Sequence, residues 1–299
     1  MRGVSALPRL IDVRHLGRER VIGCWQLGTA LVDPGPESSI KTVLAGMEGE
    51  PETLLLTHIH LDHAGATGAL VERFPKLEVW VHERGAPHLA DPSRLLQSAE
   101  RIYGDDMQRL WGRVVPVPKE NLRVLKGGEV ITAGVRELEV TYTPGHASHH
   151  VVYLDRSDGT AYVGDVGGVR IPPCDFIRPP TPPPDIDVEA WEASIDAVAA
   201  MNPSSLALTH FGGVEDPLPY LERMKERLRE QAGLVRRLLE DLGDTEAAAS
   251  AFVEETDRLT NESCDPETAR VFEQGAPRTQ LWGGLRRYWQ KHGSIQNTR

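Results

Sequence analysis

Residues 57–65 of the chain read Thr57-His58-Ile59-His60-Leu61-Asp62-His63-Ala64-Gly65, so that three histidines and an aspartate stand close together. The apolar residues 54–56 before them predict a short buried strand, and residues 64–74 after them predict a helix. The cluster is therefore expected in the loop between the two. Side chains two positions apart on an extended segment point the same way, so His58 and His60 can reach one metal ion. Asp62 and His63 can reach a neighbouring ion.

Histidine nitrogens and carboxylate oxygens are ligands that suit zinc, iron or manganese. A polar loop that is rich in histidine by chance is the alternative, but histidine is a scarce residue and the spacing favours ligands. The pattern His-x-His-x-Asp-His at the end of a strand resembles the metallo-β-lactamase superfamily. That resemblance implies a four-layer αββα sandwich, in which two mixed sheets pack face to face with helices outside. Periodicity alone gives only an α/β or α+β fold.

The resemblance also implies three further ligands, each directly after a predicted strand. His146 follows strand 138–142 and the tripeptide Thr-Pro-Gly at 143–145, Asp165 follows strand 161–163, and His210 follows strand 205–209. Taken singly, His210 could be an ordinary histidine at a strand end, and Asp165 could be a turn residue or a helix cap. Carried over from the family, one ion would have His58, His60 and His146, and the other would have Asp62, His63 and His210, with Asp165 shared between them.

This ligand set predicts the chemistry. Two divalent ions, zinc in the first place and iron or manganese otherwise, can share a hydroxide and lower its pKa to near 7. Such a hydroxide is a strong nucleophile, and the chain has no G-x-S-x-G motif for a serine nucleophile. Asp62 could orient the nucleophile or pass a proton to the leaving group. Asp62 and Asp165 are therefore the expected catalytic residues.

Departures from the family narrow the substrate. The β-lactamases of the family are secreted and usually have Cys or Ser where this chain has Asp165, so β-lactamase activity is not expected. A bridging aspartate is typical of thioesterases of the glyoxalase II type, lactonases and phosphodiesterases. Residues 64–66 read Ala-Gly-Ala where glyoxalase II tends to have x-Gly-Gly. We predict a metal-dependent hydrolase with a site like that of hydroxyacylglutathione hydrolase, acting on a small ester, thioester or lactone.

Three alternatives stay open at this point. One is a phosphodiesterase of the same fold. Another is an iron-dependent persulfide dioxygenase, because the motif does not identify the metal. The third is a non-catalytic binding protein with a degenerate site, against which the complete ligand set argues.

The composition changes after His210, where strand signals become few. Residues 220–242, 246–259, 266–273 and 281–291 predict helices. We predict a catalytic domain over residues 1–215 and a helical C-terminal subdomain over residues 216–299. The apolar side chains of these helices need a partner surface, so we expect them to pack against the site or to form a homodimer contact. A self-contained helical bundle is the alternative.

The net charge and the cysteine content limit which partners and which cellular compartment we expect. The chain has 299 residues and a formal net charge of −11, which argues against a nucleic-acid partner and leaves a small-molecule substrate. Cys24, Cys174 and Cys264 lie far apart, and we expect no disulfide framework, as is usual in a reducing cytoplasm. The first residues lack the apolar core of a signal peptide, and no apolar run approaches the roughly 18 residues of a membrane span. We therefore expect a cytoplasmic protein without a membrane partner.

Residues 167–185 leave directly from Asp165 and hold seven prolines. Proline fixes φ and removes a donor, so a stiff, extended arm that faces the substrate is expected here. Within the arm, Arg178 is predicted to bind an anionic group and Phe176 to contact the body of the substrate. Arg170 is expected instead to pair with one of the protein's own acids. His150, close after the third ligand, is predicted to lie behind the ligands or to face the substrate, with an ordinary surface histidine as the alternative.

Overall fold

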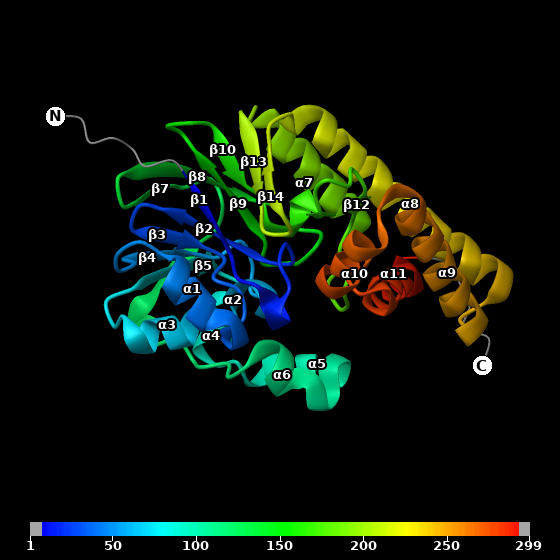
Figure 1. The fold of residues 1–299 in the computed structure, drawn as a ribbon, viewed down its shortest axis with the longest axis horizontal. Coiled ribbons are helices and arrows are strands. Elements are labelled where there is room, and N and C mark those ends of the chain that lie inside the picture. Colours follow the sequence, from blue (N-terminus) through cyan, green and yellow to red (C-terminus); the bar gives the residue numbers. More distant parts are fainter. Residues whose placement is uncertain (1–7, 293–299) are drawn as a thin grey trace.

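The computed structural model describes residues 8–292, which form two stacked β-sheets, helices on their outer faces and a helical region at the C-terminal end (Figure 1). The first sheet has the strand order β1 (Arg9–Asp12), β2 (Gly23–Leu27), β3 (Ala30–Val32), β4 (Thr53–Leu55), β5 (Glu78–His82) and β6 (Leu122–Leu125). The second sheet has the order β14 (Gly212–Val214), β13 (Ser205–Leu208), β10 (Thr160–Tyr162), β9 (Val151–Asp155), β8 (Arg136–Tyr142) and β7 (Val130–Ala133).

Both sheets are mixed. In the first, strands β3 to β6 pair in parallel, while β1, β2 and β3 pair antiparallel. In the second, β10 and β13 form the parallel pair. The helices outside the sheets, before the C-terminal region, are α1 (Ile40–Gly46), α2 (Leu61–Ala64), α3 (Thr67–Arg73), α4 (Ala86–Ala90), α5 (Ser93–Tyr103), α6 (Met107–Trp111) and α7 (Val188–Ala200). Single 3-10 turns are η1 (His15–Gly17), η2 (Glu37–Ser39), η3 (Gly104–Asp106), η4 (Lys119–Asn121) and η5 (Gly164–Gly167).

The apolar strands supply two core layers because their successive side chains point to opposite faces. On β4, Leu55 packs between the two sheets, whereas Leu54 packs toward the helices. On β9, Tyr153 likewise packs between the two sheets, and Val152 packs toward the helices. Both faces of these strands are therefore buried, which explains why they read as nearly continuous apolar runs. The predicted arrangement of two packed mixed sheets with helices outside is confirmed.

The C-terminal helices are α8 (Pro217–Leu242), α9 (Glu246–Ser263), α10 (Pro266–Gly275) and α11 (Arg278–His292). They begin close to residue 216, where the composition changes, and α8 runs beside α7 (Figure 1). Met224 and Leu228 of α8 are fully buried in the same apolar cluster as Trp191 of α7 and Ile171. The helices are thus not a self-contained bundle, because their apolar side continues the core of the sheets. A homodimer contact through them stays a prediction.

Residues 167–185 differ from the expected extended arm. They fold back on themselves through a small sheet of β11 (Val169–Arg170) and β12 (Ile177–Arg178). The prolines of this segment lie outside the two strands, so each strand keeps its backbone donors. No helix within residues 8–292 combines the length and apolar character that crossing a bilayer requires.

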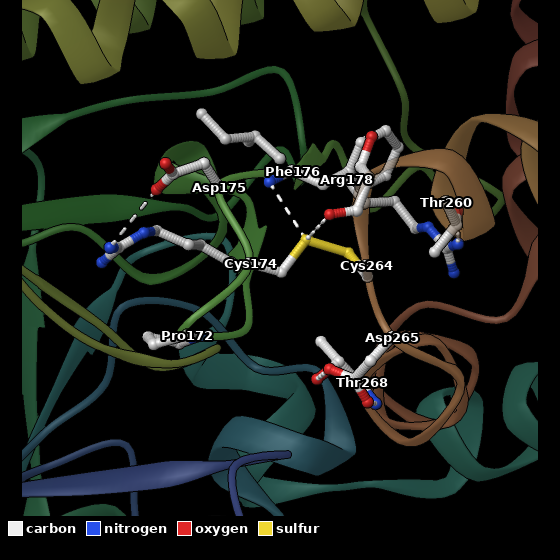
Figure 2. The surroundings of a disulfide bond; sticks show 12 residues. Pro172, Cys174, Asp175, Phe176, Arg178, Thr260, Cys264, Asp265 and Thr268 are labelled. Carbon is white, nitrogen blue, oxygen red and sulfur yellow. Dashed lines mark hydrogen bonds and ion pairs between the residues drawn. A yellow bond between two sulfur atoms is a disulfide. The ribbon is translucent and has the colours of Figure 1, made fainter.

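A disulfide joins Cys174 to Cys264, across 90 residues of sequence, with their Cα atoms 5.4 Å apart (Figure 2). The expectation of no disulfide is wrong, because the β11–β12 turn brings Cys174 against the C-terminal end of α9, where Cys264 lies. Sequence distance gave no sign of this contact. The bond also removes the observation on which the expectation of a reducing compartment rested. Cys24 is a buried free thiol.

Candidate metal centre

The seven predicted ligands meet at one edge of the two sheets. Each is delivered by the segment that follows a strand: residues 58–63 after β4, His146 after β8, Asp165 in η5 after β10, and His210 after β13. Three groups of these side chains bring their ligand atoms within 4.8 Å of one another, and each group could hold a metal ion. The groups are His58, His60 and His146; His58, His63 and Asp165; and Asp62, His63 and His210.

The first group is built from three imidazoles. Nδ1 of His60 lies 3.0 Å from Nε2 of His58 and 3.0 Å from Nε2 of His146. The other ring nitrogens are held from outside: Nδ1 of His146 donates to the Pro180 carbonyl at 2.9 Å, and Nδ1 of His58 lies 3.1 Å from the Thr57 hydroxyl. Because these nitrogens carry the ring proton, Nε2 of His58 and Nε2 of His146 present lone pairs to the centre, which His60 faces with its Nδ1.

The second group combines Asp62, His63 and His210. Oδ2 of Asp62 lies 3.4 Å from Nε2 of His210 and 3.9 Å from Nε2 of His63. Nδ1 of His210 donates to the Val21 carbonyl at 2.6 Å, and Nδ1 of His63 donates to Asp33 at 2.8 Å. The two Nε2 atoms therefore both face the centre of this group, 3.2 Å apart.

Asp165 lies between the two groups. Its Oδ2 is 3.3 Å from Nε2 of His146, and its Oδ1 is 3.1 Å from Nε2 of His63. The residue is 3% exposed, and Oδ1 accepts no hydrogen bond from the described residues. One carboxylate thus offers an oxygen to each group, which is the geometry of a bridging ligand.

The electrostatics of the site call for cations. Burial, together with neighbouring histidines, holds the pKa of His58 well below its usual value, and burial lowers the pKa of His146 to about 4. Both rings are therefore neutral ligands. Burial also acts to lower the pKa of His63, but Asp165, Asp33 and Asp62 outweigh it and raise that pKa well above its usual value.

The carboxylates also lack an ordinary counterion. Within residues 8–292, Asp33, Asp62 and Asp165 form ion pairs with histidines and with no lysine or arginine. Buried carboxylates without a cation are costly. Burial acts to lower the pKa of His210 as well, but Asp165 and Asp62 outweigh it and raise that pKa, so the site favours positive charge. Divalent ions among these atoms would supply that charge, so the residues fit such ions.

Asp33 is the functional residue that the sequence reasoning missed. Its Oδ2 accepts from the Thr57 hydroxyl at 2.7 Å, from His63 at 2.8 Å and from the Thr209 hydroxyl at 2.9 Å, while Oδ1 accepts from the Thr57 amide at 2.8 Å. It is fully buried and has a φ of 49°. A signal was present, because Asp33 directly follows β3, which pairs in parallel with the strand before the metal loop.

His150 lies behind the ligands and is fully buried. Its Nε2 accepts from the backbone amide of Asp165 at 3.3 Å, and its Nδ1 lies 2.9 Å from the Thr143 hydroxyl. Its ring stacks on His58 with the centroids 5.1 Å apart. His150 therefore positions two ligands, and His149 is the neighbour that lines the cavity beside them.

Arg178 and Phe176 do not reach the site, and their predicted substrate contacts are wrong. Arg178 is 2% exposed and donates to the Ala276 carbonyl at 3.1 Å and to the Thr260 hydroxyl at 2.6 Å (Figure 2). Phe176 packs edge-on against Phe272, with the ring centroids 5.5 Å apart. The β11–β12 turn aims both side chains at α9 and α10 instead. Arg170 lies 3.9 Å from Asp175, consistent with the expectation that it pairs with one of the protein's own acids.

A cavity of about 280 Å³ opens onto the ligands. His60, Asp62, His146 and Asp165 form part of its lining. Its apolar wall comes from three parts of the chain: Ile59 and Leu61 of the metal loop, Leu95 and Ala99 of α5, and Leu281 of α11. Pro180 and residues 182–185 also line it, so the arm of residues 167–185 faces the cavity with its last residues only.

Comparison with known proteins agrees with this geometry. The sequence profile of the Metallo-beta-lactamase superfamily matches residues 27–210. The metallo-beta-lactamase fold-containing protein ST1585 of Sulfurisphaera tokodaii is 26% identical over 211 residues, which are 70% of this chain and 77% of that protein. The crystal structure of ST1585 superposes with a TM-score of 0.69 at 20% identity, over 95% of this chain and 98% of that one. The hydroxyacylglutathione hydrolase of Gloeothece citriformis is 30% identical over 137 residues, which are 46% of this chain and 42% of that enzyme.

Proposed function

This chain belongs to the metallo-beta-lactamase superfamily, and from that premise we propose that it is a dinuclear metal-dependent hydrolase of a small ester, thioester or lactone. The superfamily consists generally of metal-dependent hydrolases, and the His and Asp groups of this chain could hold the metal. The observation that carries the proposal is the position of Asp165, whose two oxygens face two separate sets of ligand atoms. This position supports two ions that share one carboxylate.

The proposed roles divide between the two groups. When bound, two zinc ions would supply a Lewis acid and a water of lowered pKa. His58, His60 and His146 would hold one ion, and Asp62, His63 and His210 the other. Asp33, Thr57 and His150 fix the ring orientations and the Asp165 backbone, so the ligands need little rearrangement.

Asp62 is the ligand candidate best placed to handle protons. Its side chain is 24% exposed, whereas that of Asp165 is 4% exposed, and it lines the cavity beside the ligands. A carboxylate in that position can orient an attacking water and carry a proton to the departing group.

The cavity supports the substrate class. Its volume of about 280 Å³ and its apolar wall suit a small acyl body, while the ligand candidates His60, Asp62, His146 and Asp165 are part of the same lining. The similarity to hydroxyacylglutathione hydrolases over 46% of the chain favours thioesters among the candidates.

A hydrolysis screen across thioesters, lactones, esters and phosphodiesters, with metal content measured on the same samples, tests the proposal. We expect turnover of at least one acyl substrate, its loss after removal of metal and its return with zinc. Asp165→Ala and His58→Ala should lower kcat by orders of magnitude. Turnover by metal-free Asp165→Ala or a trapped acyl-enzyme would contradict the mechanism. Cleavage of phosphodiesters alone would identify a phosphodiesterase instead, and oxygen consumption with bound iron a dioxygenase.

A further inference from the structure

A second cavity, of about 470 Å³, borders the same ligands from another side. Asp62 and His210 form part of its lining, so it reaches the second ligand group directly. It adjoins the first cavity, because the two share the lining residues Asp62, Tyr103, Gly275, Pro277 and Gln280. The candidate metal centre is thus open to two compartments.

Two helices meet between these compartments. The hydroxyl of Tyr103, at the end of α5, lies 3.4 Å from the side-chain oxygen of Gln280 on α11. Both residues line both cavities. A substrate whose reacting carbonyl lies at the ligands can therefore extend one arm into each cavity, on either side of the Tyr103–Gln280 contact.

The second cavity carries an excess of positive charge. Its charged lining residues, apart from the ligand candidate Asp62, are Arg18, Arg109, Arg270 and Glu273. Arg109 is paired with Asp106 at 2.9 Å, and Glu273 is paired with Arg278 at 2.7 Å. Arg18 and Arg270 form no ion pair with any acid of residues 8–292, and both are exposed. The guanidinium of Arg18 donates to the backbone carbonyl of Arg270 at 3.1 Å, which holds the two residues side by side. In a chain of net charge −11, two arginines without an acidic partner on one cavity point to an anionic ligand.

The wall behind these arginines is built around two stacked rings. His15 and Trp111 lie parallel with their centroids 5.5 Å apart, and they are 2% and 8% exposed. Nδ1 of His15 and Nε1 of Trp111 are buried without a hydrogen-bond partner among the described residues. His15 is held between Arg14 and Leu16, whose φ angles are 48° and 52°. Unsatisfied polar atoms and left-handed non-glycine residues are both uncommon and concentrate at functional sites.

The first cavity differs in its charge. It also holds two arginines, Arg84 and Arg94, but the guanidinium of Arg84 stands over the ring of Tyr142 at 5.6 Å. Asp185 lies among the same lining residues and opposes their charge. The apolar wall of Leu95, Ala99 and Leu281 suits a carbon chain there.

We propose that the second cavity is the subsite for an anionic arm of the substrate, carrying a carboxylate or a phosphate, which Arg18 and Arg270 bind while the apolar arm occupies the first cavity. This inference rests on the proposed function and gives its substrate a class: an amphiphilic thioester or ester with one charged end. The charged end can belong to the acyl part or to the departing thiol, and both have the chemistry that the two guanidinium groups recognise.

Three matched thioesters test the subsite on metal-loaded protein at low ionic strength. S-butanoyl mercaptopropionate carries its charge on the thiol arm, S-ethyl monothioglutarate carries it on the acyl arm, and S-ethyl thiobutanoate is neutral. In Arg18→Ala/Arg270→Ala we expect KM to rise ~10-fold or more for one of the anionic thioesters and less than about twofold for the neutral one. The thioester that responds shows which arm is charged. Equal effects on all three, or none, overturn the proposal.

Two control variants separate the subsite from general charge effects. Arg101→Ala removes the same charge from α5 outside both cavities and should leave every KM within about twofold. Arg18→Lys/Arg270→Lys should restore most of the affinity, which shows that the loss in the alanine variant is not misfolding. If Arg94→Ala raises the KM of the anionic thioester instead, the anion lies in the first cavity and the proposal is wrong.

A binding measurement keeps the subsite testable without turnover. Calorimetry with methylthiopropionate, an unreactive anion, should give a Kd for the wild-type protein that rises ~10-fold in Arg18→Ala/Arg270→Ala and stays unchanged in Arg101→Ala. If the wild-type protein hydrolyses none of the thioesters, the thioester part of the proposed function fails, while this pair of Kd values still decides whether the cavity binds anions. Equal Kd values in the wild type and the double variant reject it.

Discussion

Asp33 accepts a hydrogen bond of 2.8 Å from Nδ1 of His63, although 30 residues separate them. The same carboxylate also accepts hydrogen bonds from the hydroxyls of Thr57 and Thr209. Thr57 follows β4 of the first sheet, and Thr209 follows β13 of the second sheet. A single buried acid therefore fixes the orientation of a ligand and ties the two sheets together next to it.

Replacing this acid tests its positioning role. Asp33→Asn removes the negative charge and turns one oxygen into an NH₂ group, so either His63 and the two hydroxyls or the Thr57 amide lose their acceptor. Loss of such a partner usually weakens metal binding by about 10–100-fold, and we expect zinc affinity to fall in that range. The matched control is Thr209→Val, which removes a single bond to Asp33 and should have a smaller effect. A zinc Kd unchanged in Asp33→Asn would show that the carboxylate does not orient the ligand.

The disulfide should stabilise the contact between the arm and the helical region. Cross-linking residues 90 apart restricts the unfolded chain strongly. We expect Cys174→Ser/Cys264→Ser to lower the free energy of unfolding by about 2–5 kcal/mol in urea denaturation. Cys24→Ser serves as the control, because it replaces a buried free cysteine and leaves the disulfide intact. In this variant, reductant should lower the urea midpoint of unfolding as much as it does in the wild type. Identical midpoints for the wild type with and without reductant would mean that the bond contributes no stability.

Arg178 should act on stability and not on substrate charge. Burial lowers its pKa to about 10, and its guanidinium donates to Ala276 and Thr260. Arg178→Met loses both bonds, so we expect about 3 kcal/mol less free energy of unfolding. The KM for an anionic thioester should stay within about twofold of the wild-type value once the folded fraction is corrected for. Arg170→Met, at a half-buried arginine of the same arm, is the control and should cost less stability. A selective rise of KM in Arg178→Met would restore the anion-binding role.

Acid should destabilise the metal-free protein. Burial lowers the pKa of His146 to about 4, while the unfolded chain keeps the ordinary value of 6.5. Between pH 6.5 and 4 the unfolded state therefore binds more protons than the folded state. The free energy of unfolding should decrease as the pH is lowered through this range, by about 3 kcal/mol for this group. The lowered pKa of His58 acts in the same direction. The raised pKa of His63 acts oppositely, since its contribution is present at low pH and is lost as pH rises.

Urea titrations of the metal-free protein at several pH values measure this slope. His146→Asn should make the slope shallower, because one of the groups that titrate differently in the folded and unfolded states is gone. A wild-type stability that is constant between pH 6.5 and 4.5, or that rises on acidification, would contradict the assignment of His146 as a neutral buried ligand.

The residues of the candidate metal centre could be predicted in two ways. His58 and His60 follow an apolar strand and have the spacing of ligands in the sequence itself, whereas Asp165 also follows a strand but is predicted from the resemblance to the metallo-β-lactamase superfamily. Asp33 follows a strand too, at the end of 30–32, but a lone acid before Pro-Gly also fits an ordinary turn. The parallel pairing of β3 with β4 shows that Asp33 lies beside the metal loop and is not an ordinary turn residue, and this pairing cannot be predicted from the local sequence.

The arm shows where local reasoning fails. Prolines indicate stiffness correctly, yet they do not say which way a stiff segment turns. The pairing of β11 with β12 and the bond between Cys174 and Cys264 depend on where α9 ends, almost a hundred residues later. Arg178 therefore points into the protein, whereas Arg18 and Arg270, which no motif singles out, share a cavity because η1 and α10 meet there.

The most direct test of a dinuclear hydrolase is a zinc titration of the metal-free protein, with thioester hydrolysis followed at each addition. We expect the rate to rise with added zinc and to reach its plateau at two equivalents per chain, because Asp165 joins two ligand groups into one site. A rate that is independent of zinc, or a plateau at a single equivalent, would contradict the central claim.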